Sequence, residues 1–194
     1  MNFSNIFMDQ IKIYDNFFDK EDIDYIKHTI FESKSYNDCI YRHYQNRFGA
    51  KAYYQYPLDN YTFFSDYCKQ LFSHRIVERK FRIIRCNLLS QSYGQSGSFH
   101  VDHPRVNGLT EYKNHQNPNT KEFTIMLYIN INEDSESNSS IIFKTDQKHI
   151  VEFETKNNRI ILFPAHYYHY PGHHNEGNSS YIRTAITFKC EYID

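Results

Sequence analysis

Apolar residues recur with two different periods along the chain. Up to about residue 80 the period is helical: apolar positions from Ile23 to Phe31 recur three or four residues apart, behind Asp19, which can cap a helix. A second apolar stripe predicts a helix over 60–72, and a short strand is predicted over 11–14. The front of the chain is therefore expected to be mainly helical.

From residue 81 onward apolar and polar residues alternate, which indicates strands. We predict strands at 81–90, 98–102, 121–132, 140–145, 149–155, 159–163, 166–170 and 181–192. In the third of these, every second residue from Phe123 to Ile131 is apolar, while the residues between them form a more polar face. The polar side is expected to line a cavity and the apolar side to pack on the helices. Short strands separated by turns predict an antiparallel sandwich or barrel, and residues 34–57 follow no clear period.

The length of 194 residues predicts one domain, with 1–80 as a helical support region and 81–194 as the β core. A formal net charge of −1 without a basic run argues against a nucleic-acid partner. The four cysteines form no CxxC pair, so we expect free thiols in a reducing compartment. With neither a signal-like N-terminus nor a long apolar run, the sequence predicts a cytoplasmic protein without membrane contact.

His100 and Asp102 are the first candidates for chemistry. Residues at i and i+2 of a strand leave the same face with their Cα atoms about 6.6 Å apart, so both can hold one ion. A histidine from a distant strand would complete a set of two histidines and one carboxylate. Such a set suits non-heme Fe(II) and leaves coordination positions open.

The distal histidine is predicted to be His169, at the end of a strand, six residues beyond Phe163. His166 is the alternative, whereas His173 and His174 follow a Pro-Gly pair in an expected loop. Arg183 comes fourteen residues after His169. Because a guanidinium binds a carboxylate through two parallel hydrogen bonds, Arg183 can bind a dicarboxylate. We expect it to be the only strong cation available to neutralise the distal carboxylate of such a molecule inside the barrel.

The residues from Arg85 to Phe188 resemble the catalytic double-stranded β-helix, a jelly-roll or cupin-like barrel, of the 2-oxoglutarate/Fe(II)-dependent dioxygenases, especially the prolyl-hydroxylase-like branch. The motifs that carry the resemblance are His100-Val101-Asp102, Tyr128-Ile129-Asn130, Phe163-Pro164 followed by His169, and Arg183-Thr184-Ala185-Ile186-Thr187. The Gly-Gly pair common in this family is replaced by Ser139-Ser140. The resemblance covers a little over half of the chain.

The resemblance implies residue roles. His100, Asp102 and His169 would bind the iron, and Arg183 would bind the distal carboxylate of 2-oxoglutarate. Tyr128 and Thr187 would support that carboxylate. Asn87 and Tyr93 resemble Arg-x-Asn and Tyr-Gly positions that precede the His-x-Asp pair in many members.

The resemblance also implies an activity: Fe(II), 2-oxoglutarate and O2 are used, ascorbate is a stimulant, and succinate and CO2 are released. The substrate would be a C–H bond of a protein side chain, prolyl included, or of a small molecule. Two alternatives stay open. The stretch from Arg183 to Lys189 resembles the Arg-x-Asn-x-Thr-x-Arg motif of alkylation-repair dioxygenases, although Ala185 and Lys189 replace its asparagine and second arginine. The other alternative is a non-catalytic barrel that binds a metal or ligand.

Overall fold

The computed structural model describes residues 10–32, 40–42, 53–92, 99–102, 121–130, 139–144, 150–172 and 182–193. Its helical elements are α2 (Lys20–Lys27), the π-helix η1 (His28–Glu32), the π-helix η2 (Phe63–Tyr67) and α3 (Cys68–Arg75). Its strands are β1 (Lys12–Tyr14), β2 (Ile40–Arg42), β3 (Tyr53–Pro57), β4 (Phe81–Ser92), β5 (Glu122–Asn130), β6 (Ser140–Lys144), β7 (Ile150–Glu154), β8 (Arg159–Pro164), β9 (Tyr168–Pro171) and β10 (Ile182–Tyr192). None of the described helices is both long and apolar enough to cross a membrane.

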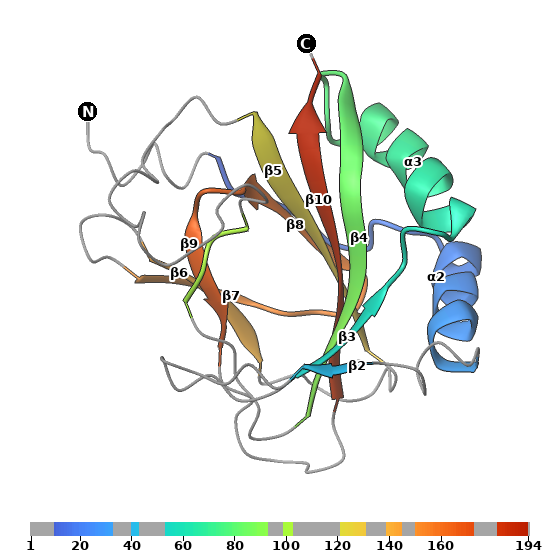
Figure 1. Cartoon of the computed structure of the whole chain (residues 1–194), viewed down its shortest axis with the longest axis horizontal. Helices are drawn as coiled ribbons and strands as arrows, with labels where there is room; N and C mark the ends of the chain where they lie inside the picture. Colours follow the sequence, from blue (N-terminus) through green and yellow to red (C-terminus); the bar gives the residue numbers. More distant parts are fainter. Residues whose placement is uncertain are drawn as a thin grey trace.

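The described strands form two antiparallel sheets (Figure 1). The larger has seven strands in the order β1-β8-β5-β10-β4-β3-β2, and the smaller has three in the order β7-β6-β9. This confirms the predicted antiparallel, mainly β architecture. The described strands make two sheets, which is consistent with a jelly-roll fold but does not show a closed barrel. The strand predicted at 98–102 is wrong for residues 99–102, where only one isolated bridge joins His100 to His169.

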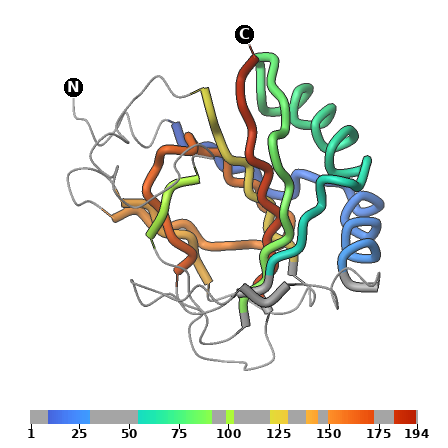
Figure 2. Tube along the Cα trace, viewed as in Figure 1, coloured from blue at the N-terminus to red at the C-terminus, as the bar shows by residue number. Residues whose placement is uncertain are grey.

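The helices pack on the outer face of the large sheet, as Figures 1 and 2 show beside β4. Asp19 caps α2 through a 2.9 Å hydrogen bond from the amide of Asp22 to its carboxylate, as its position predicted. The second predicted helix is present as η2 followed by α3, and it continues to Arg75. Ile26, Phe64 and Phe72 contribute fully buried side chains from these helices to the outer core.

The alternation in β5 and β10 gives each strand two different faces, and the apolar face packs under the helices, as predicted. The other face was expected to line a cavity, and part of it belongs to a second hydrophobic cluster. Phe123, Ile125, Leu127 and Ile129 of β5 belong to the outer core under the helices. Met126, Tyr128 and Ala185 belong to an inner cluster with residues of β6 and β8. The register places Ala185 opposite Tyr128 and Lys189 opposite Thr124, so the inner face carries both apolar and polar side chains.

The segment 34–57 contains β2 and β3, which had no periodic signal. Pairing decides their conformation: Tyr54 to Pro57 align with Ser90 to Asn87 of β4. Among the described cysteines, Cys68, Cys86 and Cys190 are free and buried, as predicted. Burial raises the pKa of all three thiols, so they are unreactive core residues. Cys39 lies outside the described residues.

Candidate metal centre

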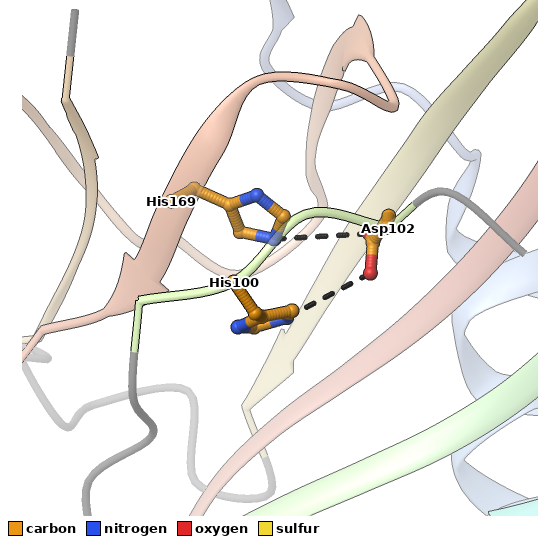
Figure 3. Close-up of side chains that lie close together, drawn as sticks. All are labelled: His100, Asp102 and His169. Carbon is orange, nitrogen blue, oxygen red and sulfur yellow. Dashed lines mark ion pairs between the residues drawn. The ribbon is translucent and has the colours of Figure 1, made fainter. Parts of the chain in front are cut away.

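His100, Asp102 and His169 converge between the two sheets, with their side chains turned toward one another (Figure 3). The Nε2 atom of His100 lies 3.7 Å from Oδ1 of Asp102, and the Nε2 atom of His169 lies 3.7 Å from Oδ2. One candidate ligand atom from each residue lies within 4.8 Å of the others. The structure therefore brings together the three residues that the spacing predicted.

Backbone hydrogen bonds hold the segment 99–102 against β9 and the turn that precedes it. The amide of His100 donates to the carbonyl of His169 at 2.8 Å, and the amide of His169 returns the bond at 2.9 Å. The amide of Asp102 donates to the carbonyl of Ala165 at 2.8 Å. The ring of Phe99 stacks on Tyr168 with centroids 5.1 Å apart. These contacts hold residues 99–102 and 165–169, which are far apart in sequence, together at the candidate ligands.

The surroundings of His169 fix which of its ring nitrogens carries the proton. Its Nδ1 lies 2.9 Å from the carbonyl of Tyr167, and since a carbonyl only accepts, Nδ1 carries the proton. The lone pair then belongs to Nε2, which is buried and has no hydrogen-bond partner among the described residues. Burial, aided by His100, lowers the pKa of His169 to about 4, so the ring is neutral at physiological pH. A buried acceptor without a donor, beside a carboxylate, fits a metal ion.

The carboxylate of Asp102 is held on both oxygens. Oδ1 accepts a 2.8 Å hydrogen bond from Nζ of Lys189, and Oδ2 accepts a 3.0 Å bond from the hydroxyl of Thr124. Burial by itself would raise the pKa of Asp102, but the charges of His169, Lys189 and His100 hold it below its usual range. The group is therefore an ionised carboxylate in a fixed orientation, which suits a divalent cation such as Fe(II).

The structure distinguishes the candidate distal histidines that it describes. His169 is buried beside Asp102, whereas His166 is part of the lining of a separate cleft that includes Lys12 and Arg79. The choice of His169 over His166 agrees with this placement. His173 and His174 lie outside the described residues, as does Tyr93.

Arg183 is buried in β10, where its guanidinium joins the two sheets. Nη1 donates to the carbonyls of Ser140 at 2.9 Å and Gly172 at 3.4 Å, and Nη2 donates to the side chain of Gln91. Ser140 belongs to the Ser-Ser pair that replaces the Gly-Gly pair of the family that the sequence resembles. It binds Arg183 through its backbone oxygen, which a glycine would offer as well.

Tyr128, Thr187 and Asn87 are buried on the same inner face. The hydroxyl of Tyr128 donates to the sulfur of Met126 at 2.8 Å, and that of Thr187 donates to the carbonyl of Asn87 at 3.4 Å. Burial raises the pKa of Tyr128; the charge of Arg183 lowers it and that of Asp102 raises it. The tyrosine is therefore close enough to both residues to respond to their charges, so the predicted co-substrate residues share one interior.

Three interior contacts, those of Lys189, Thr124 and Gln91, were not predicted from the sequence. Lys189 places a second cation on the inner face, where it reaches Asp102. That Arg183 is the only strong cation available to a distal carboxylate stays a prediction. The alternation of the strands did place two of these residues on the inner face: Lys189 lies an even number of residues from Arg183, and Thr124 an even number from Tyr128. Alternation indicates the face of a strand, but it does not say which side chains meet there.

No protein-family model matches the sequence, and no curated protein matches it. Solved structures do. A prolyl hydroxylase from Trichoplax adhaerens, in complex with a hypoxia inducible factor peptide fragment, matches with a TM-score of 0.63 at 15% identity, over 98% of this chain and 89% of that one. An oxidoreductase of the 2OG-Fe(II) oxygenase family from Burkholderia pseudomallei matches with a TM-score of 0.63 at 10% identity, over 97% and 88%.

HygX from Streptomyces hygroscopicus, with nickel, 2-oxoglutarate and hygromycin B bound, matches with a TM-score of 0.59 at 9% identity, over 100% of this chain and 88% of that one. Identities this low carry the architecture and not the activity. The chain has the fold of the 2-oxoglutarate/Fe(II) oxygenases, prolyl hydroxylases among them.

Proposed function

We propose that this protein is an Fe(II)- and 2-oxoglutarate-dependent dioxygenase that hydroxylates a C–H bond. The observation that carries the proposal is the donor set itself: two histidines and one carboxylate, with a buried Nε2 of His169 that has a lone pair and no hydrogen-bond donor among the described residues. Bound Fe(II), with 2-oxoglutarate and O2, would supply the oxidising chemistry and release succinate and CO2.

The chain's own residues would hold and orient the reactants. We assign His100, Asp102 and His169 to the metal. Arg183 would bind the distal carboxylate of 2-oxoglutarate, because its present acceptors at Ser140 and Gly172 are neutral carbonyls and a carboxylate forms a stronger, charge-assisted pair.

Tyr128, Thr187 and Asn87 would shape the interior around that carboxylate, since all three are buried on the face that carries Arg183. We assign Tyr93 to the same pocket from its motif alone. Stimulation by ascorbate remains a prediction.

The proposed substrate is a protein side chain or a small molecule. The side chain of His100 is 46% exposed whereas that of His169 is 1% exposed, so the centre is open to solvent on the side of His100. A substrate can approach from there while the opposite side stays sealed. Structures with this fold hold a hypoxia inducible factor peptide in one case and hygromycin B in another, which supports both substrate classes. The near-neutral net charge argues against a nucleic-acid substrate, because binding to DNA or RNA depends on positive charge that neutralises phosphates.

The proposal is tested by adding Fe(II) and 2-oxoglutarate without oxygen, recording the metal-to-ligand absorption band, and then measuring O2-dependent succinate release with peptide and metabolite panels. We expect the band and succinate from the wild type. His169→Ala should lose both, and His166→Ala, a histidine three residues away outside the centre, should keep both. Metal uptake by the wild type without the band or succinate would favour the non-catalytic barrel.

A further inference from the structure

Lys189 touches the ligand set without belonging to it. Its Nζ lies 2.8 Å from Oδ1 of Asp102 and 3.5 Å from the backbone oxygen of the same residue. Its side chain is 24% exposed, so the ammonium is held in a partly buried position on the inner face of β10. Any ion that uses the carboxylate of Asp102 therefore becomes a near neighbour of a fixed positive charge.

The charged surroundings of Asp102 can be named for the described residues. There the groups whose charges act on the Asp102 carboxyl are His169, Lys189 and His100. Within the described part of the chain, no second carboxylate joins the cluster of potential ligands. Among these residues the ammonium of Lys189 already balances the single negative charge of Asp102, and they offer no further negative charge to a divalent cation added to the centre.

Two consequences follow from Coulomb's law. The ammonium should weaken the binding of a bare divalent ion. Like charges a few ångströms apart, at an effective dielectric constant of about 20, repel by more than ~1.4 kcal/mol, which is the free energy of a tenfold change in affinity. An anion that arrives with the metal should remove the penalty, because its charge attracts both cations. Metal and anion then bind cooperatively, and the coupling acts equally in both directions.

We propose that Lys189 makes metal binding at His100, Asp102 and His169 depend on a carboxylate-bearing co-substrate. The inference rests on the proposed function in taking 2-oxoglutarate as that carboxylate. Lys189 is a positioning residue in this scheme, since it acts through Asp102 and through its charge.

A purely structural role for Lys189 predicts the opposite sign. If the ammonium only orients the carboxylate of Asp102, then its removal should weaken metal binding, because a ligand that is not held must be ordered by the metal. If charge dominates, then removal should strengthen the binding of metal alone. Lys189→Gln separates the two, because the amide keeps a hydrogen-bond donor for Oδ1 and loses the charge.

The test is a titration of the metal-free full chain with Co(II), followed by its absorption bands, without and with saturating 2-oxoglutarate. We expect 2-oxoglutarate to raise the Co(II) affinity of the wild type at least tenfold. Lys189→Gln and Lys189→Met should bind Co(II) alone at least tenfold more tightly than the wild type, and the enhancement by 2-oxoglutarate should shrink by a similar factor. Lys189→Arg, which keeps the charge, should behave like the wild type, as should Lys20→Met in α2, an exposed lysine of the helical layer.

Equal or weaker Co(II) binding in Lys189→Gln overturns the proposal in favour of simple orientation, and so does a wild-type affinity that ignores 2-oxoglutarate. If Lys189→Met fails to fold, judged by urea unfolding, the glutamine variant decides alone. Succinate release by the wild type reports on the proposed function separately. Turnover without coupling overturns only the role of Lys189, whereas a 2-oxoglutarate effect on Co(II) affinity without turnover leaves that role standing and contradicts the dioxygenase activity.

Discussion

Replacing Thr124 with valine tests whether the carboxylate of Asp102 is held for a metal. Thr124 is fully buried in β5, and its hydroxyl donates to Oδ2 of Asp102 at 3.0 Å. Valine has nearly the same shape but leaves a buried, charged acceptor with one donor fewer, which costs about 1–3 kcal/mol. Losing a partner that orients a ligand typically lowers metal affinity about 10- to 100-fold.

The assay is Co(II) titration together with urea unfolding of the metal-free protein. We expect Thr124→Val to lose at least tenfold in Co(II) affinity and about 1–3 kcal/mol in unfolding free energy. Thr184→Val is the matched control: Thr184 is also fully buried, but its hydroxyl lies 3.4 Å from that of Ser90, away from Asp102. It should change stability slightly and leave Co(II) affinity unaltered. Wild-type Co(II) affinity in Thr124→Val would refute the orienting role of the hydroxyl.

Three further predictions follow from the same interior. Arg183→Lys keeps the positive charge but loses the two parallel hydrogen bonds that a guanidinium gives to a carboxylate. It should raise the Kd for 2-oxoglutarate about tenfold in the anaerobic absorption titration while Fe(II) affinity stays constant. An unchanged Kd would place the co-substrate elsewhere. The folded pKa of His169 is about 4 against an ordinary value of 6.5, so between these pH values the unfolded chain binds a proton that the folded chain does not. Stability of the metal-free protein should therefore fall as the pH drops from about 6.5 to about 4, by at most ~1.4 kcal/mol per pH unit, and urea unfolding of His169→Gln should lack this component; identical slopes would contradict it. Gly172→Ala should lower unfolding free energy by about 1–3 kcal/mol in thermal melts, because its methyl group would meet the Ser140 side chain and lie 3.1 Å from the Ser140 carbonyl; an unchanged Tm would show that β6 gives way without cost.

Much of the candidate site could be predicted because its residues sit in strongly patterned strands. Alternation in β5 and β10 indicated which side chains face inward, and this holds for Tyr128, Arg183 and Thr187. Local spacing also selected His169, which the strand β9 buries. The segment 99–102 was less predictable, since one bridge to His169 rather than a strand positions its two candidate ligands.

The sequence by itself indicated the mainly β architecture, the two N-terminal helices and the three residues that meet at the candidate metal centre. These depend on apolar periods of two and of three to four residues and on short motifs, which are local features of the chain. Tertiary structure alone decided the electrostatics of the centre. Lys189 and Asp102 are 87 residues apart, and their contact depends on β10 pairing with β5 in the register that sets Lys189 opposite Thr124. A period of two indicates the face of a strand but not its partner or register, and charge acts through distances in space.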